Sequence, residues 1–134
     1  MRTILLYVMV FLHIVDDYYL QGILVQMKQK SWWEKNAPDP LYKNDYRVAL
    51  IEHAFSWTFT IMLPITVLMV INNNILIVPW TVAFVVNWII HGWVDHLKAN
   101  VHNISLVVDQ AIHIWQIFVT WCLMTEIMEI MEIL

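Results

Sequence analysis

Four long apolar runs, separated by short polar segments, dominate the pattern of hydrophobic and polar positions along the chain. A membrane-spanning helix needs about 20 mainly apolar residues to cross about 30 Å of hydrocarbon. Such helices are predicted at about residues 3–26, 46–71, 75–99 and 104–134. The segment 27–45 is rich in charged side chains and contains Pro38 and Pro40, so it is predicted to be a loop. The pattern therefore predicts an all-α polytopic membrane protein, a four-helix up-down transmembrane bundle forming one domain over residues 1–134.

Residues that favour turns and helix ends lie between these runs. Residues 72–74, all asparagine, predict a tight reversal between the second and third helices. Pro79 fits the first turn of the third helix, where its missing N–H costs no hydrogen bond, whereas Pro64 lies inside the second run and predicts a kink. Asn103 or Ser105 is expected to cap the fourth helix.

The composition supports a bilayer as the solvent. Hydrophobic residues make up 60% of the chain and charged residues 13%, and the mean hydropathy is +0.63. Such a short chain has more apolar material than its own core can bury. Two glycines, four prolines and the lack of alternating strands argue against an outer-membrane barrel, and the single Cys122 excludes an internal disulfide. A net charge of −4 without a basic patch argues against nucleic-acid binding.

The positive charges are unevenly distributed between the two ends of the predicted bundle. The end with the first and third loops holds Lys28, Lys30, Lys35, Lys43, Arg47 and Lys98, and the opposite end holds only Arg2. Cytoplasmic loops carry an excess of Lys and Arg. The loop at 27–45 is therefore expected in the cytoplasm and both chain termini outside.

Histidine and aspartate recur at a spacing of four within the apolar runs. Residues four apart share a helix face and can converge on one metal ion. Ionisable groups inside a membrane are costly, so each needs a partner or a watery cavity. An up-down bundle would bring the three pairs to a similar depth, with His53 on the remaining helix. The three pairs are His13 with Asp17, His91 with Asp95, and Asp109 with His113.

These side chains predict a divalent metal site. Imidazole and carboxylate together suit zinc, the expected metal, or manganese or iron. A cation would also offset the cost of burying the carboxylates. Because the candidates exceed the needs of one tetrahedral site, either two metals bind or some members orient the ligands. The expected metal ligands are His13, Asp17, His91, Asp95, Asp109 and His113.

Other polar residues lie three or four positions from a pair member. Gln21, Asn87 and Lys98 are expected to orient the ligands. A second set is expected to point away from the site and to face the headgroup region. That set is Asp16, His96, His102 and Gln110.

Aromatic, sulfur-containing and acidic residues have simpler interpretations. The tryptophans are expected to be interfacial anchors and packing groups, and the methionines to fill the core. The acidic end of the last run is expected to be a solvated tail or a partner surface. Its members are Glu126, Glu129 and Glu132.

The order of these motifs resembles a known family. His-x-x-x-Asp followed by Leu-Gln begins at His13, His-x-x-x-Asp-x-x-Lys begins at His91, and Asp-Gln-x-x-His begins at Asp109. The pattern is similar to an uncharacterised family of small bacterial and phage membrane proteins, a domain of unknown function, and covers most of the chain. The resemblance implies a bacterial inner membrane but transfers no activity. A looser similarity links the chain to membrane-bound metal-dependent hydrolases.

The leading hypothesis is a metal-dependent hydrolase of a phosphoester-type substrate, acting at the cytoplasmic leaflet on a lipid head or nucleotide. A bound cation lowers the pKa of water and stabilises developing negative charge. Asp17, Asp95 and His53 are the expected catalytic residues, with His53 as a ligand or proton shuttle. Lys98 is expected to hold an anionic group of the substrate.

Two other classes of function fit the same residues. The cluster would be a structural metal or a hydrogen-bonded core in a non-enzymatic, possibly phage-encoded interaction module, whose partner is a second copy or a host membrane protein. A closed coordination shell would favour that class. Alternatively, buried His and Asp side chains mark proton or ion pathways.

Overall fold

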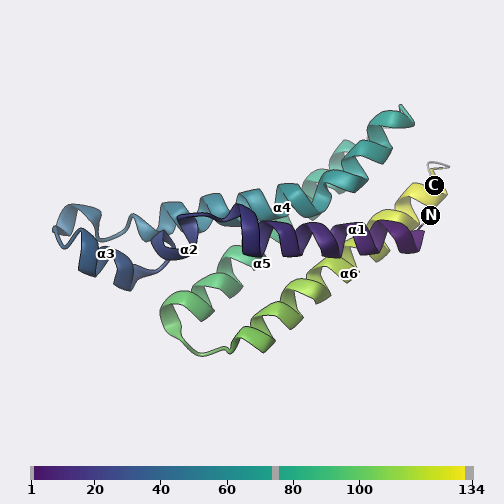
Figure 1. The fold of residues 1–134 in the computed structure, drawn as a ribbon. Coiled ribbons are helices and arrows are strands. Elements are labelled where there is room, and N and C mark those ends of the chain that lie inside the picture. Colours follow the sequence, from purple (N-terminus) through teal and green to yellow (C-terminus); the bar gives the residue numbers. More distant parts are fainter. Residues whose placement is uncertain (1, 74–75, 132–134) are drawn as a thin grey trace.

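The computed structural model describes residues 2–73 and 76–131, which are almost entirely helical and contain no strand (Figure 1). The helices are α1 (Arg2–Val15), the π-helical turn η1 (Asp16–Leu20), α2 (Leu24–Met27), α3 (Lys30–Asn36), the 3-10 turn η2 (Pro40–Tyr42), α4 (Tyr46–Ile71), α5 (Ile77–His96), the π-helical turn η3 (Leu97–Val101) and α6 (Leu106–Ile130).

The four long helices form a closed arrangement in which α1 contacts α4 and α6, and α5 contacts the same two helices. The start of α1 and the end of α6 lie side by side (Figure 1). There Arg2 pairs with Glu126 at 2.6 Å and with Glu129 at 2.7 Å. The acidic end of α6, expected to be a solvated tail or a partner surface, is thus partly neutralised within the chain, although the Glu126 and Glu129 side chains remain exposed. Glu132 lies outside the described residues.

Four helical segments are long and apolar enough to cross a membrane: Arg2–Leu20, Pro40–Ile71, Ile77–Val101 and Leu106–Ile130. Large apolar side chains such as Ile4, Phe11 and Ile89 are exposed, while many polar side chains are buried. Apolar surface facing outward is expected where the surrounding solvent is lipid. The all-α fold with four candidate spans is therefore confirmed.

The apolar core lies toward the end of the bundle that holds the two chain termini. Met9, Met62 and Met124 are fully or almost fully buried there, together with Trp57 and Ile61. The expectation that methionines fill the core is thus confirmed for the buried ones, whereas Met27 is half-buried and Met131 is exposed. Unbranched Met side chains adapt to irregular gaps between helices.

The prediction of one continuous first helix over residues 3–26 is wrong. The α-helix ends at Val15, η1 follows, and the chain turns at Gly22 before the short α2. Gly22 has a φ of +53°, a left-handed conformation that favours glycine. The predicted loop at 27–45 is also partly helical, because it contains α3 and the 3-10 turn η2. The Asp39 side chain caps this turn by accepting a hydrogen bond from the Leu41 N–H.

Several predicted helix ends are confirmed. The Ser105 side chain accepts a hydrogen bond from the Val108 N–H at 3.3 Å and caps α6. Pro79 lies in the first turn of α5, and Asn72 and Asn73 form a turn after α4. The third residue of the predicted reversal, at position 74, lies outside the described residues.

The two π-helical turns bring the polar residues together. A π-helix is wider than an α-helix and is often found at functional sites. In η1, the consecutive Asp16 and Asp17 both turn inward. In η3, Asn100 donates to the Lys28 carbonyl at 3.0 Å and accepts from the Lys30 N–H at 2.7 Å. These contacts hold the segment between α2 and α3 beside the end of α5.

Candidate metal centre

Six side chains from all four long segments converge inside the bundle, and they are called the His/Asp cluster below. Each is buried or nearly so. Two overlapping groups of three have ligand atoms close enough to share a metal ion: Asp17 with His53 and His91, and His91 with Asp95 and His113. The cluster consists of Asp17, His53, His91, Asp95, Asp109 and His113.

The first part of the cluster surrounds His53 Nε2. This atom lies 3.1 Å from His91 Nε2, 3.3 Å from Asp95 Oδ2 and 3.5 Å from Asp17 Oδ1. Two ligand atoms on one tetrahedral zinc ion are about 3.3 Å apart, given metal–ligand bonds of about 2.0–2.1 Å. The observed spacing therefore suits metal ligands.

The second part of the cluster surrounds His113. His113 Nε2 lies 3.4 Å from both Asp95 Oδ1 and Asp109 Oδ1, and His113 Nδ1 lies 3.2 Å from His91 Nδ1. Asp95 thus faces His53 with one carboxylate oxygen and His113 with the other. Of these side chains, His91, Asp95 and His113 have ligand atoms close enough to share a metal ion, whereas Asp109 belongs to neither group of three.

His13 lies beside the cluster, but both of its ring nitrogens have protein partners. Trp57 Nε1 donates to His13 Nδ1 at 2.8 Å, so the ring proton lies on Nε2, which donates to Gln110 Oε1 at 3.1 Å. Gln110 Nε2 in turn donates to Asp17 Oδ2 and Asp109 Oδ2, each at 3.1 Å. This chain of hydrogen bonds orients two carboxylates and leaves their Oδ1 atoms facing the histidines.

The expectation that Asp16 and Gln110 face the headgroup region is wrong. Gln110 bridges His13 to two aspartates, as described above. The Asp16 carboxylate is buried and accepts hydrogen bonds from Ser56 at 2.9 Å and Thr60 at 3.1 Å, while its other oxygen lies 3.8 Å from His53 Nδ1. The wide π-helical turn explains the inward position of Asp16.

Two lysines approach the cluster from the same side. Lys28 Nζ donates to Asp95 Oδ2 at 2.5 Å, and Lys98 Nζ donates to Asp109 Oδ2 at 2.6 Å. A cavity of about 500 Å³ reaches this side and is lined by both lysines, Asp17, Asp95 and Gln110. The wall of the cavity therefore contains both ammonium groups and carboxylates of the cluster. The ammonium groups would attract anions.

The three residues expected to orient the ligands lie around the cluster. Gln21 donates to the main-chain carbonyl of Asp17 and lies 3.4 Å from its Oδ1 atom. Lys98 holds Asp109, as described above. Asn87 acts one step further away, because its main-chain carbonyl accepts a hydrogen bond from Gln116 at 3.3 Å, and the Gln116 side-chain oxygen lies 3.1 Å from His113 Nδ1.

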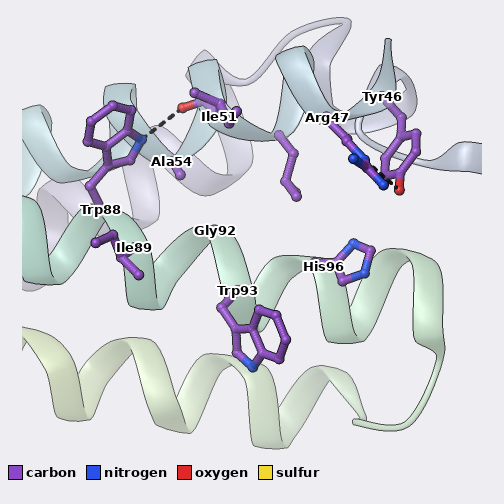
Figure 2. A pocket seen from close by; sticks show the side chains of 10 residues that line it. Tyr46, Arg47, Ile51, Ala54, Trp88, Ile89, Gly92, Trp93 and His96 are labelled. Carbon is purple, nitrogen blue, oxygen red and sulfur yellow. Dashed lines mark hydrogen bonds between the residues drawn. The ribbon is translucent and has the colours of Figure 1, made fainter. Parts of the chain in front are cut away.

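A separate apolar groove of about 570 Å³ lies between α4 and α5 (Figure 2). It is lined by side chains such as Ile51, Ala54 and Trp93, with Arg47 and His96 toward one end. Its lining includes no member of the His/Asp cluster. His96 belongs to this groove, whereas the exposed His102 lines the polar cavity.

Sequence reasoning missed several residues that support the site. Trp57 was expected to be an anchor or packing group; it is fully buried, stacks on His91 with ring centroids 4.0 Å apart, and also holds His13. Its position four residues after His53 was the available signal. No spacing in the sequence indicates the role of Lys28, because the turn at Gly22 is what brings Lys28 beside Asp95.

Comparison of the chain with models of protein families, with curated proteins and with solved structures found no match. The resemblance to a family of small bacterial and phage membrane proteins therefore stays a prediction.

Proposed function

We propose that this protein is an integral membrane hydrolase whose four long helices cross the bilayer up and down and hold a divalent metal ion, with zinc favoured over manganese or iron. The supporting observation is that Asp95 belongs to the buried His/Asp cluster and also lines a cavity with two lysines. Catalytic metal sites keep a position open to substrate, whereas structural sites are closed.

The charge of the cavity favours an anionic substrate of the phosphoester type. Lys28 and Lys98 bring two ammonium groups to its wall beside Asp17 and Asp95. Lysine acts as a point charge toward phosphate oxygens. A lipid head or a nucleotide entering from the membrane surface would meet these ammonium groups first.

The residues of the cluster divide the work of hydrolysis. A bound divalent cation supplies an activated water and stabilises the developing negative charge. Asp17 lines the cavity and serves as the general base, and His53, 3.5 Å from Asp17 Oδ1, takes the proton onward. Asp95 holds the cation, while Gln110 keeps the Asp17 carboxylate in place.

The distribution of charge orients the proposed protein in its membrane. The cavity opens beside α2 and η3 and is lined by Lys28 and Lys98, and Lys30 begins the neighbouring α3. By the positive-inside rule this end faces the cytoplasm and both termini lie outside. The host membrane would be the inner membrane of a bacterium, as the resemblance to the uncharacterised family implies.

Turnover of phosphoesters tests this proposal. Detergent-purified protein loaded with Zn²⁺ or Mn²⁺ is offered a panel that includes an aryl phosphate, a nucleotide and phosphatidic acid. Asp95→Asn should lower turnover by about 100-fold or more, as expected for loss of a group central to the chemistry. Asp45→Asn, which removes a carboxylate outside the cluster, should leave turnover unchanged. Equal turnover in the Asp95→Asn variant would contradict the proposal.

A second candidate is a non-enzymatic interaction module with a hydrogen-bonded polar core. The unbroken chain of hydrogen bonds from Trp57 through His13 and Gln110 to Asp17 supports it. A folded protein that binds no metal, hydrolyses nothing and forms a stable complex with a second copy or another membrane protein would favour this function. Ion flux in vesicles that survives loss of Asp95 and His113 would instead favour an ion pathway.

A further inference from the structure

The apolar groove between α4 and α5 has a cationic side chain at one end (Figure 2). Arg47, at the start of α4, lines the groove and is exposed, and its Nε donates to the Tyr46 hydroxyl at 3.3 Å. Among the described residues no carboxylate pairs with Arg47, whereas Arg2, Lys28 and Lys98 each pair with at least one. The Arg47 guanidinium therefore keeps N–H donors for an external anion.

His96, at the end of α5, adds a second donor at the same end of the groove (Figure 2). The Asn100 amide is oriented by the Lys30 N–H, which donates to its Oδ1 at 2.7 Å, and by the Lys28 carbonyl, which accepts from its Nδ2 at 3.0 Å. Asn100 Nδ2 also lies 3.4 Å from His96 Nδ1, which therefore accepts from it. The proton of the His96 ring then lies on Nε2. Among the described residues this N–H has no acceptor.

Tyr46 holds the two donors beside one buried ring. This ring stacks on His96, with centroids 6.2 Å apart and an interplanar angle of 19°, and the Arg47 guanidinium lies 5.8 Å from its centroid. Tyr46 itself is only 7% exposed, so its position is fixed by the bundle. A ring contact attracts a guanidinium without neutralising its charge. The end of the groove is therefore already arranged to receive an anion.

The rest of the groove is apolar and runs along the two helices. Ile51 and Ile89 line it and are exposed. Ala54 and Gly92 also line it, and a Cβ added at Gly92 would lie 3.4 Å from the Ala54 Cβ, so the two helices approach closely there. Arg47 and Ala54 are seven positions apart on α4, which is about 10 Å along a helix axis. The groove thus leads from the polar donors into the depth of the proposed membrane layer.

Comparison with a second apolar groove shows why the charge of Arg47 matters. That groove, of about 350 Å³, lies between α5 and α6 and is lined by side chains such as Val82, Trp115 and Leu123, with no charged side chain. Apolar exposure alone is expected anywhere on a surface that faces lipid. An apolar groove that ends in cationic donors instead matches an anionic lipid, and basic pockets between transmembrane helices on the cytoplasmic side bind such headgroups.

We propose that the groove between α4 and α5 binds one anionic phospholipid, with an acyl chain along Ala54 and Gly92 and the phosphate beside Arg47 and His96. The groove volume of about 570 Å³ lies within the range of about 300–1,000 Å³ that is typical of ligand sites. Arginine suits this role, because its guanidinium binds phosphate through two N–H groups. The inference rests on the membrane insertion in the proposed function but not on hydrolysis, since the groove shares no residue with the His/Asp cluster.

Native mass spectrometry of the full chain in detergent tests the proposal. The protein is titrated with phosphatidylglycerol, which is anionic, or with phosphatidylcholine, whose phosphate is balanced by its own cation. We expect a complex with one lipid that forms more readily with phosphatidylglycerol. Arg47→Gln should weaken phosphatidylglycerol binding about tenfold, because a charge-assisted contact to phosphate is lost. Lys43→Gln, which removes a positive charge outside the groove, is the matched control and should bind like wild type.

A second pair of variants tests the apolar part of the groove. Ile89→Trp places a larger side chain in the groove and should remove most of the complex with one lipid. Val78→Trp adds the same ring at an exposed position of α5 outside the groove and should leave lipid binding unchanged. Both replaced side chains are exposed, so the core is not disturbed. Glycerol phosphate, a headgroup without acyl chains, should bind much more weakly than phosphatidylglycerol, because it buries no apolar surface.

The outcomes distinguish this site from the polar cavity and from hydrolysis. The absence of a complex with one lipid, or equal phosphatidylglycerol binding by Arg47→Gln and Lys43→Gln, would overturn the proposal. Binding lost in Lys98→Gln but kept in Arg47→Gln would place the lipid in the polar cavity and also overturn it. A wild-type dimer that Ile89→Trp dissociates would make a second copy the occupant, with the same consequence. Asp95→Asn should keep lipid binding, so a protein that binds lipid at Arg47 but hydrolyses no phosphoester would support the groove and contradict only the hydrolase.

Discussion

Replacing Gln110 with leucine should weaken metal binding without removing any ligand. The Gln110 amide donates to Asp17 Oδ2 and Asp109 Oδ2, and its oxygen accepts from His13, so leucine would remove three hydrogen bonds at once. Loss of partners that orient ligands typically lowers metal affinity about 10–100-fold. This range corresponds to about 1.4–2.7 kcal/mol of binding free energy.

The assay is a competition titration of Zn²⁺ against a coloured chelator in detergent. Gln29→Leu is the matched control, because Gln29 lines the same cavity but its side chain donates to the nearby Val25 carbonyl and not to the cluster. Circular dichroism and gel filtration show whether both variants keep the wild-type fold. A well-folded Gln110→Leu variant with the zinc affinity of the control would refute the supporting role of Gln110.

Three further substitutions probe separate parts of the structure. Trp57→Phe replaces the indole with a smaller aromatic ring and removes the donor to His13 Nδ1, and it should lower stability by about 1–3 kcal/mol in unfolding followed by fluorescence. Lys28→Gln removes the ammonium beside Asp95, so the apparent Kd for inorganic phosphate should rise about tenfold in isothermal titration, with metal content unchanged. Met62→Ala opens a cavity in the core and should cost about 2–5 kcal/mol, with zinc stoichiometry retained.

The four long helices were largely predictable because each apolar run meets the length that a membrane-spanning helix needs. Helices must satisfy their own backbone hydrogen bonds in hydrocarbon, so long apolar runs become helices. The structure confirms α4 at the predicted residues 46–71. It differs at the first run, where the turn at Gly22 divides the helix, because a single glycine in a left-handed conformation leaves little trace in the hydrophobic pattern.

The convergence of His and Asp was predictable from their spacing, and the details of the site were not. Spacing of four places His91 and Asp95 on one face whatever the surroundings. The inward turn of Asp16 depends on the π-helical geometry of η1, and the approach of Lys28 depends on contacts of Asn100 far along the chain. Gln110 lies next to Asp109, and an α-helical wheel alone does not show that its side chain reaches across to His13.

The metal content of the purified wild-type protein tests the central claim most directly. After loading with Zn²⁺ or Mn²⁺ and removal of free ions, elemental analysis should find a divalent metal bound in proportion to the chain, lost in Asp95→Asn and kept in Asp45→Asn. The absence of bound metal from a well-folded wild-type protein, or equal metal in both variants, would contradict the account.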